Sequence, residues 1–143
     1  MMMRNGMIKI FLVALSGLSA APVTASELQR IRATENASVF IDRTTLTRTG
    51  DVATVWSLWD HSSDQLNMFE EPYRSARLHS AYNCKERTVR LIEIAEYQGS
   101  FGRGNLVRNY PAGDSEPRSI PPGTVGEDIF KQVCPTPHRA NEF

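Results

Sequence analysis

The chain has 143 residues, with 16 basic and 16 acidic side chains, a formal net charge of zero, and only two cysteines. A chain of this length fits one domain with one modest core. The balanced charge gives no global indication of nucleic-acid binding, so we expect no nucleic-acid partner.

The first 25 residues have the pattern of a signal peptide. Arg4 and Lys9 precede an apolar run over residues 10–18, and small residues follow up to Ala25. The run is well short of the ~20 residues that a membrane-spanning helix needs. We therefore expect cleavage and export, with a retained N-terminal anchor as the alternative.

Removal of this segment defines the expected domain organisation: signal peptide 1–25, one domain 26–134, and a flexible tail 135–143. The removed segment contains two basic residues and no acid, which leaves 14 basic and 16 acidic residues. We expect no stable membrane span in the mature chain and a location in the periplasm, at the cell surface or outside the cell.

Residues 38–110 show strand patterns separated by turn residues. In residues 52–60 the side chains alternate, and Trp56 and Trp59 fall on opposite faces, which is typical of a central strand; we expect Trp56 in the core. We predict loops at 61–72 and 111–122, and a hairpin turn at residues 49–51. The predicted strands are residues 38–42, 52–60, 73–83, 88–97 and 105–110, with residues 28–33 as a further candidate.

A short helix is predicted to begin at Thr124. Thr124 and Glu127 have capping-box spacing, in which the hydroxyl accepts from the Glu127 amide and the carboxylate accepts from the Thr124 amide. An apolar stripe follows along about three turns, and Pro135 and Pro137 end it. Because isolated helices shorter than about 12 to 15 residues are marginal in water, this helix must pack on another element. The stripe consists of Val125, Ile129, Phe130 and Val133.

Cys84 and Cys134 most simply pair with each other in an exported chain, with two free buried thiols as the alternative. The bond would close a loop of about 50 residues and contribute on the order of 4 kcal/mol on the chain-entropy model. It would hold the end of the helix. Strands followed by one helix predict an α+β domain: an antiparallel β-sheet meander of about five to six strands with one C-terminal helix held to the sheet by a disulfide.

Four segments together resemble the surface-adhesin E-like domain of proteobacteria: FIDRTTLTRTGDVATVWSLWD, PYRSARLHSAYNCKER, GSFGRGNLV and IPPGTVGEDIFKQVC. The resemblance covers roughly residues 28–134. The chain departs from the pattern at Leu28 or Ile31, where a tryptophan is frequent, and at Asn83, where an acid often precedes the first cysteine.

The resemblance implies an antiparallel sheet, a disulfide-held helix and a binding role. Namesake members bind host matrix glycoproteins, some as dimers, so we expect an adhesin-like, non-enzymatic module and keep a homodimer open. The alternative functions are a periplasmic structural or assembly partner and a small periplasmic hydrolase. Neither a cofactor nor a metal is expected.

A local excess of basic residues offers a candidate binding surface. Five cations lie between residues 73 and 90 with one acid, Glu86, on two strands that a short turn connects. Such a patch suits an acidic glycan, or a host or environmental glycoprotein; the alternative is a solvated face whose arginines cover apolar surface. The candidate residues are Arg74, Arg77, Lys85, Arg87 and Arg90.

An enzyme would need a different constellation. Asp60, His61 and Asp64 could imitate an acid/base or metal cluster, but Ser and Asp runs between strands are ordinary turn chemistry. No second histidine or partner motif lies nearby in the sequence. We therefore expect no catalytic residues.

Overall fold

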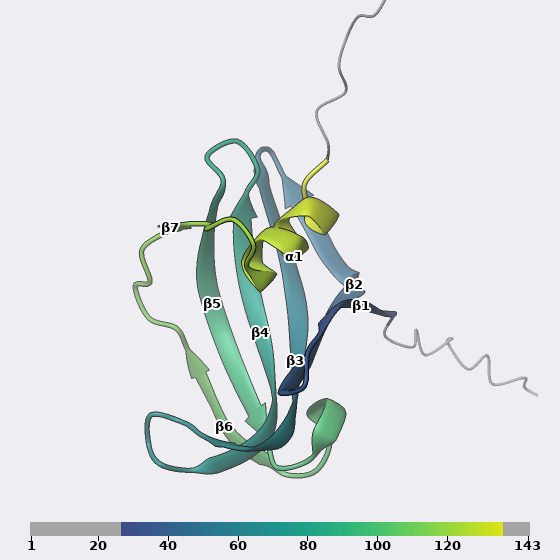
Figure 1. The fold of residues 1–143 in the computed structure, drawn as a ribbon. Coiled ribbons are helices and arrows are strands. Elements are labelled where there is room, and N and C mark those ends of the chain that lie inside the picture. Colours follow the sequence, from purple (N-terminus) through teal and green to yellow (C-terminus); the bar gives the residue numbers. More distant parts are fainter. Residues whose placement is uncertain (1–26, 136–143) are drawn as a thin grey trace, which may run out of the picture.

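The computed structural model of the protein describes residues 27–135, which form one antiparallel sheet with a helix across one face (Figure 1). The strand order follows the chain from β1 to β6, and the short β7 pairs with β5. This confirms the predicted fold class, whereas the signal peptide and the tail beyond residue 135 lie outside the described residues. The elements are β1 (Leu28–Ala33), β2 (Ala37–Thr49), β3 (Val52–Leu66), β4 (Pro72–Asn83), β5 (Thr88–Tyr97), η1 (Ser100–Gly102), β6 (Leu106–Pro111), β7 (Arg118–Ser119) and α1 (Val125–Val133).

Strand β2 is longer than the predicted strand over residues 38–42. It continues to Thr49 through an irregularity between Asp42 and Thr47. There the Asp42 carboxylate accepts the amide of Thr44 at 3.1 Å, and the Thr45 hydroxyl donates to the Asp42 carbonyl at 2.7 Å. These local bonds lie where the register with β3 shifts, and the strand continues beyond them.

Two predicted loops are partly wrong. Strand β3 runs on to Leu66, because residues predicted as a polar loop pair with neighbouring strands: Ala37 lies opposite His61, and Tyr73 opposite Gln65. In the predicted 111–122 loop, Arg118 pairs with Val89 in the two-residue β7. Tertiary pairing overrides the local turn signal in both places.

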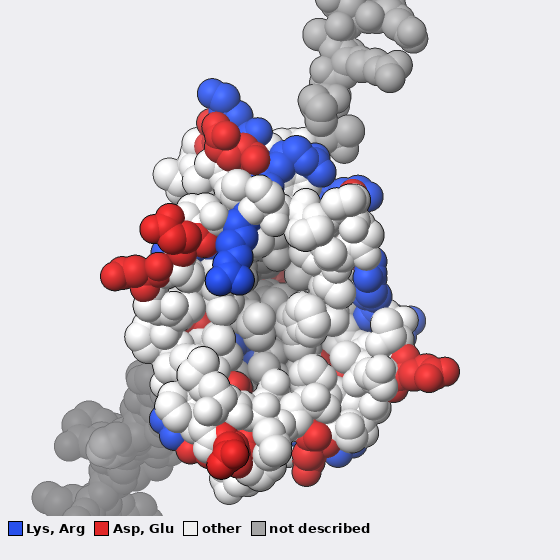
Figure 2. Space-filling model, turned by 60° about the vertical axis from the view of Figure 1, so that its left-hand side comes forward, with Lys and Arg blue, Asp and Glu red and all other residues white. Residues whose placement is uncertain are grey.

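Helix α1 crosses the sheet near the β2–β3 and β4–β5 turns (Figure 1). Its residues Ile129, Phe130 and Val133 are buried, and each contributes roughly 1.5 to 3 kcal/mol of apolar burial. The rest of this face is left open, and Figure 2 shows a hollow walled mainly by uncharged residues. The core cluster consists of Val39, Ile41, Ala53, Val55, Tyr82, Ile120, Ile129, Phe130, Val133 and Cys134.

The placement of Trp56 differs from the prediction. Val55 and Trp59 contact the core on the helix-bearing face, so Trp56 projects from the opposite face of β3. It is only partly buried there. Both faces of the strand carry a tryptophan, as predicted, but only Trp59 packs against the core.

The predicted helix start is confirmed, with one difference in its capping. The Thr124 hydroxyl accepts the Glu127 amide at 3.3 Å. The Glu127 carboxylate accepts the amide of Gly123 at 2.5 Å, one residue before the predicted donor. Because Gly123 adopts φ +76°, the chain turns sharply enough to present that amide to the carboxylate.

The end of α1 is attached to the sheet at several points. Cys84 and Cys134 form the predicted disulfide, with a Cα–Cα distance of 5.5 Å. The Cys84 amide donates to the Asp51 carbonyl at 2.7 Å, which connects the two turns. The Arg48 guanidinium donates to the Val133 carbonyl at 2.7 Å. Within residues 27–135, no helix is long and apolar enough to cross a membrane.

Candidate functional site

The structure does not gather all five predicted cations on one surface. Arg74 and Arg77 lie three residues apart on β4, so their side chains leave opposite faces of the sheet. Arg74 lies 3.3 Å from the Asp64 carboxylate and donates to the His61 carbonyl at 2.8 Å. Its charge is therefore locally balanced, and its position is far along β4 from the β4–β5 turn.

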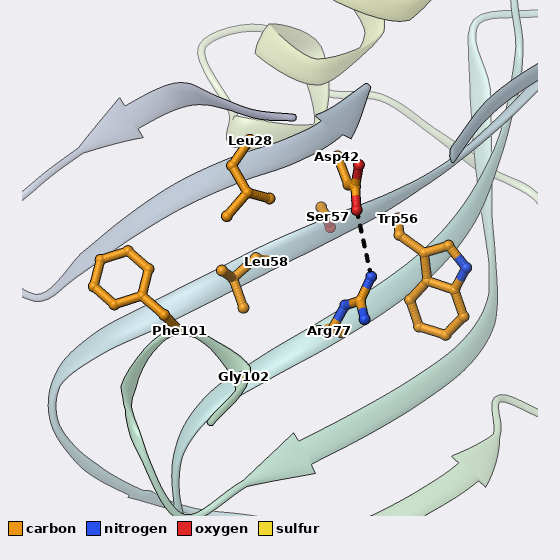
Figure 3. Close-up of a pocket in the computed structure, with 8 residues that line it drawn as sticks. All are labelled: Leu28, Asp42, Trp56, Ser57, Leu58, Arg77, Phe101 and Gly102. Carbon is orange, nitrogen blue, oxygen red and sulfur yellow. Dashed lines mark ion pairs between the residues drawn. The ribbon is translucent and has the colours of Figure 1, made fainter. Parts of the chain in front are cut away.

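Arg77 belongs to a small pocket on the face opposite α1 (Figure 3). Its guanidinium lies 3.6 Å from the buried Asp42 carboxylate and 5.3 Å from the centroid of the Trp56 ring. The Trp56 and His79 rings are stacked, with centroids 4.8 Å apart. Because Arg77 already has an anionic partner, it adds little free positive charge to this face.

Lys85 and Arg87, in contrast, lie together at the β4–β5 turn. A third cation, which was not predicted from the sequence, lies beside them. With Lys131 of α1 they line a concavity of about 320 Å³ beside Cys84 and Cys134. We call this concavity the basic hollow. Arg90 is exposed on β5 outside its lining.

Asn83 shapes the turn that carries Lys85 and Arg87. Its side-chain oxygen accepts the amides of Lys85 at 3.1 Å and Glu86 at 2.9 Å. This is an Asx-type turn, in which a short side chain stands in for a backbone acceptor. Asn83 therefore supplies an acceptor at the position where the family pattern often has an acid.

Arg87 is fixed by its backbone and by its side chain. It adopts φ +55°, a conformation uncommon for residues other than glycine. Its amide donates to the Asn83 carbonyl at 2.9 Å, and its own carbonyl accepts the Ile120 amide at 3.2 Å. The guanidinium lies over the Phe130 ring, 4.7 Å from the centroid.

Lys131 enters the hollow from the last turn of α1. Its ammonium lies 2.9 Å from the Glu127 carboxylate, one helical turn earlier. The hydrogen bond from Lys131, and then that from the Gly123 amide, lowers the pKa of Glu127 below its ordinary value. The available signal in the sequence was that Lys131 lies three residues before the cysteine that the disulfide brings to the turn.

The basic hollow therefore has charged groups on a rigid support. Lys85, Arg87 and Lys131 are exposed at the surface, whereas Phe130 and the disulfide beneath them are mostly buried. Ammonium and guanidinium groups placed in this way can bind carboxylate or sulfate groups through charge-assisted hydrogen bonds.

Comparison with known proteins gives the family. Residues 27–135 match the surface-adhesin protein E family. The chain belongs to this family. No curated protein matches the sequence.

Solved structures of Haemophilus influenzae protein E share this fold. One has a TM-score of 0.56 at 16% sequence identity, over 80% of this chain and 90% of that one. A second crystal form has a TM-score of 0.56 at 17% identity, over 82% of this chain and 96% of that one. Protein E from non-typeable Haemophilus influenzae has a TM-score of 0.55 at 16% identity, over 80% of this chain and 81% of that one. At such identities the likeness shows the fold alone.

The acidic segment considered for catalysis has other partners. Asp60 accepts the amide of Phe101 at 2.8 Å, and Asp64 pairs with Arg74. Burial lowers the pKa of His61, whose ring packs edge-on against Tyr73 at 5.7 Å. No group of three or more His, Cys, Asp or Glu side chains within residues 27–135 is placed to hold a metal ion. Membership of an adhesin family suggests a non-enzymatic protein.

Proposed function

We propose that this member of the surface-adhesin protein E family is an exported binding module that recognises an acidic glycan, free or carried by a matrix glycoprotein. The basic hollow is the contact surface. The observation that carries the proposal is that Lys85 and Arg87, which form no ion pair among the described residues, lie together beside the Cys84–Cys134 bond. Lys131 adds a third cation, whose charge Glu127 partly balances. The chain has no excess of positive charge, so attraction to an acidic ligand must come from such a local cluster.

Rigidity supports this proposal as much as charge does. The turn is fixed by Asn83, by the Arg87–Phe130 contact and by the disulfide. A surface that is ordered before binding loses less conformational entropy when the ligand arrives. Lys85 and Arg87 are therefore better placed to bind than equally exposed cations on mobile segments.

The test is binding of the purified protein to immobilised heparin, used as a sulfated-glycan probe. The double variant Lys85→Glu/Arg87→Glu should bind about tenfold more weakly, mainly through slower association, because two exposed attractive pairs are lost and become repulsive. The control variant Arg90→Glu/Arg103→Glu changes net charge equally at exposed sites outside the hollow. It should keep most of the binding, and an equal loss in both variants would contradict the proposed surface.

The place of action is a separate part of the proposal. Membership of a surface-adhesin family implies an exported or surface location, and we propose that the protein reaches the outer surface. Added protease should then degrade it on intact cells. Degradation only after the outer membrane is opened would instead favour the periplasmic assembly partner. The homodimer stays a prediction, which light scattering of the purified protein would test.

A further inference from the structure

A larger concavity, distinct from the basic hollow, lies on the helix-bearing face of the sheet. Its volume is about 740 Å³, within the range usual for small-molecule sites. The floor is formed by Leu78 of β4 and by Leu91 and Ile94 of β5. Leu78 lies opposite Ile94, and Ser80 lies opposite Leu91 beyond a shift in register. Because Leu78 and Ser80 are two residues apart on β4, all these side chains project from the same face of the sheet. Figure 2 shows the hollow on this side of the molecule. We call it the apolar groove.

Exposed apolar side chains stand at one end of the apolar groove. Met68 is 78% exposed and Phe69 is 49% exposed, and both line it. The Phe69 ring packs edge-on against Tyr110 at 6.2 Å, and the Arg108 guanidinium lies 4.0 Å above it. Large apolar side chains that are exposed to solvent beside a concave apolar surface are typical of a binding site.

A polar network holds this end in place. The Asn67 side chain accepts the amides of Phe69 at 2.9 Å and Glu71 at 3.0 Å, and donates to the nearly buried Glu96 carboxylate at 2.7 Å. Glu71 in turn pairs with Arg108. The turn that displays Met68 and Phe69 is therefore fixed by side-chain bonds, so the exposure of these two residues is built into the fold.

Three polar groups along the walls already have partners. The Ser115 hydroxyl donates to the Leu91 carbonyl at 2.5 Å, and the Ala112 amide donates to the Ile92 carbonyl at 2.9 Å. The Tyr110 hydroxyl donates to Glu96 at 3.0 Å. A peptide buried here would leave its own amides and carbonyls unpaired, at a cost in free energy. A hydrocarbon chain has no such cost.

The charged residues that line the apolar groove itself, Arg118 and Glu116, lie at the end away from Met68 and Phe69. Arg118 lines it from β7, where it is paired with Val89 at the end of the floor. Among the described residues, Arg118 forms no ion pair. Glu116 also lines this end, but from the connecting segment before β7. Arg118 is thus the better fixed of the two charged groups. Its partner Val89 precedes Ile94 on β5 by a distance of about 16 Å, at ~3.3 Å per residue.

We infer that the apolar groove binds a free single-chain amphiphile with an anionic head group. The hydrocarbon chain lies on Leu78, Leu91 and Ile94, toward Met68 and Phe69. The head group meets the Arg118 guanidinium. This binding activity is additional to glycan recognition and uses a different surface.

The test is a titration of the purified protein, with ¹³C-labelled Leu, Ile, Met and Val methyl groups, by tetradecanoate below its critical micelle concentration. The methyl signals of Leu78, Leu91 and Ile94 should shift in a saturable, one-to-one manner, whereas those of Ile129 and Val133 under α1 should not. Tetradecyltrimethylammonium, with the same chain and the opposite head charge, should bind about tenfold more weakly.

Surface variants then test each end without disturbing the core. Arg118→Glu should remove or reverse the preference for tetradecanoate, whereas Arg103→Glu, an equal charge change at an exposed site outside the groove, should leave it unchanged. Met68→Ser should weaken binding of both ligands about threefold, because less apolar surface is covered. Leu66→Ser, at a residue 69% exposed but outside the lining, is the matched control and should have no effect.

Several results would overturn the inference. Absence of floor-methyl shifts, or equal shifts at Ile129 and Val133, would remove the site. A head-group preference that Arg118→Glu does not change would remove the role of Arg118. Shifts produced by anionic lipid vesicles but not by free tetradecanoate would identify a bilayer, and shifts produced only by an apolar peptide would identify a protein partner; either would contradict the proposed occupant.

Discussion

The Arg87 guanidinium lies 4.7 Å from the centroid of the Phe130 ring, so the β4–β5 turn and helix α1 are joined by a cation–π contact as well as by a disulfide. Arg87 is three residues after Cys84, and Phe130 is four residues before Cys134. The same side chain that offers charge to a ligand therefore also helps to hold the helix on the sheet.

Replacing Arg87 by glutamine should lower the free energy of unfolding by about 0.5 to 1 kcal/mol, the usual contribution of an exposed cation–π pair. Glutamine keeps the same backbone requirement, so the change isolates the guanidinium. Lys85→Gln removes an equal charge from the same turn and should leave the denaturation midpoint nearly unchanged. Equal midpoints for the two variants would contradict a stabilising role for the contact.

Loss of the disulfide should have a larger effect. Cys134→Ser should cost about 2 to 5 kcal/mol, because the unfolded chain regains the freedom of a loop of about 50 residues. Hydrogen exchange should increase first in α1, since the helix is short and depends on this attachment. Amides of α1 that remain as protected as those of β3 in the variant would show that apolar packing alone holds the helix.

The sequence predicted the features that depend on local chemistry. Thr124, Glu127 and the apolar stripe define α1 by capping and periodicity, and two cysteines allow only one intramolecular pair. Features that depend on pairing between distant segments were missed. Residues after Asp60 look like a turn until β4 is placed beside them. Trp56 was expected in the core, but α1 covers the other face of β3, where Trp59 lies. Lys131 joins Lys85 and Arg87 only when α1 packs beside the β4–β5 turn, so a search for charge along the sequence finds two members of the site and not the third.

The helix cap gives a third prediction. Thr124→Ala removes the acceptor of the Glu127 amide and should cost about 1 kcal/mol. Thr124→Ser keeps a hydroxyl at the cap and should restore most of this loss, as measured by chemical denaturation. If the serine variant were as unstable as the alanine variant, the stabilisation would come from the threonine methyl group and not from the cap.

Stability should depend on pH through Glu127. Its pKa in the folded protein is lowered, first by Lys131 and then by the Gly123 amide, from an ordinary value of 4.5. A lowered folded pKa means that the stabilisation is fully present above pH 4.5 and is lost as the pH falls through the folded pKa. Glu127→Gln should therefore be less stable than the parent protein at pH 7, and the difference should shrink below pH 4.5. A difference that stays constant between pH 7 and pH 3 would show that the carboxylate charge is not responsible.

Residue-resolved NMR during a titration with a heparin oligosaccharide would locate glycan binding on the protein surface. The largest backbone and side-chain shifts should fall on Lys85, Arg87 and Lys131 and should decrease as salt is added, because exposed charges are screened beyond about 8 Å at physiological ionic strength. Largest shifts at Arg74 and Arg77, or saturable binding that leaves the basic hollow unshifted, would contradict the proposed contact surface.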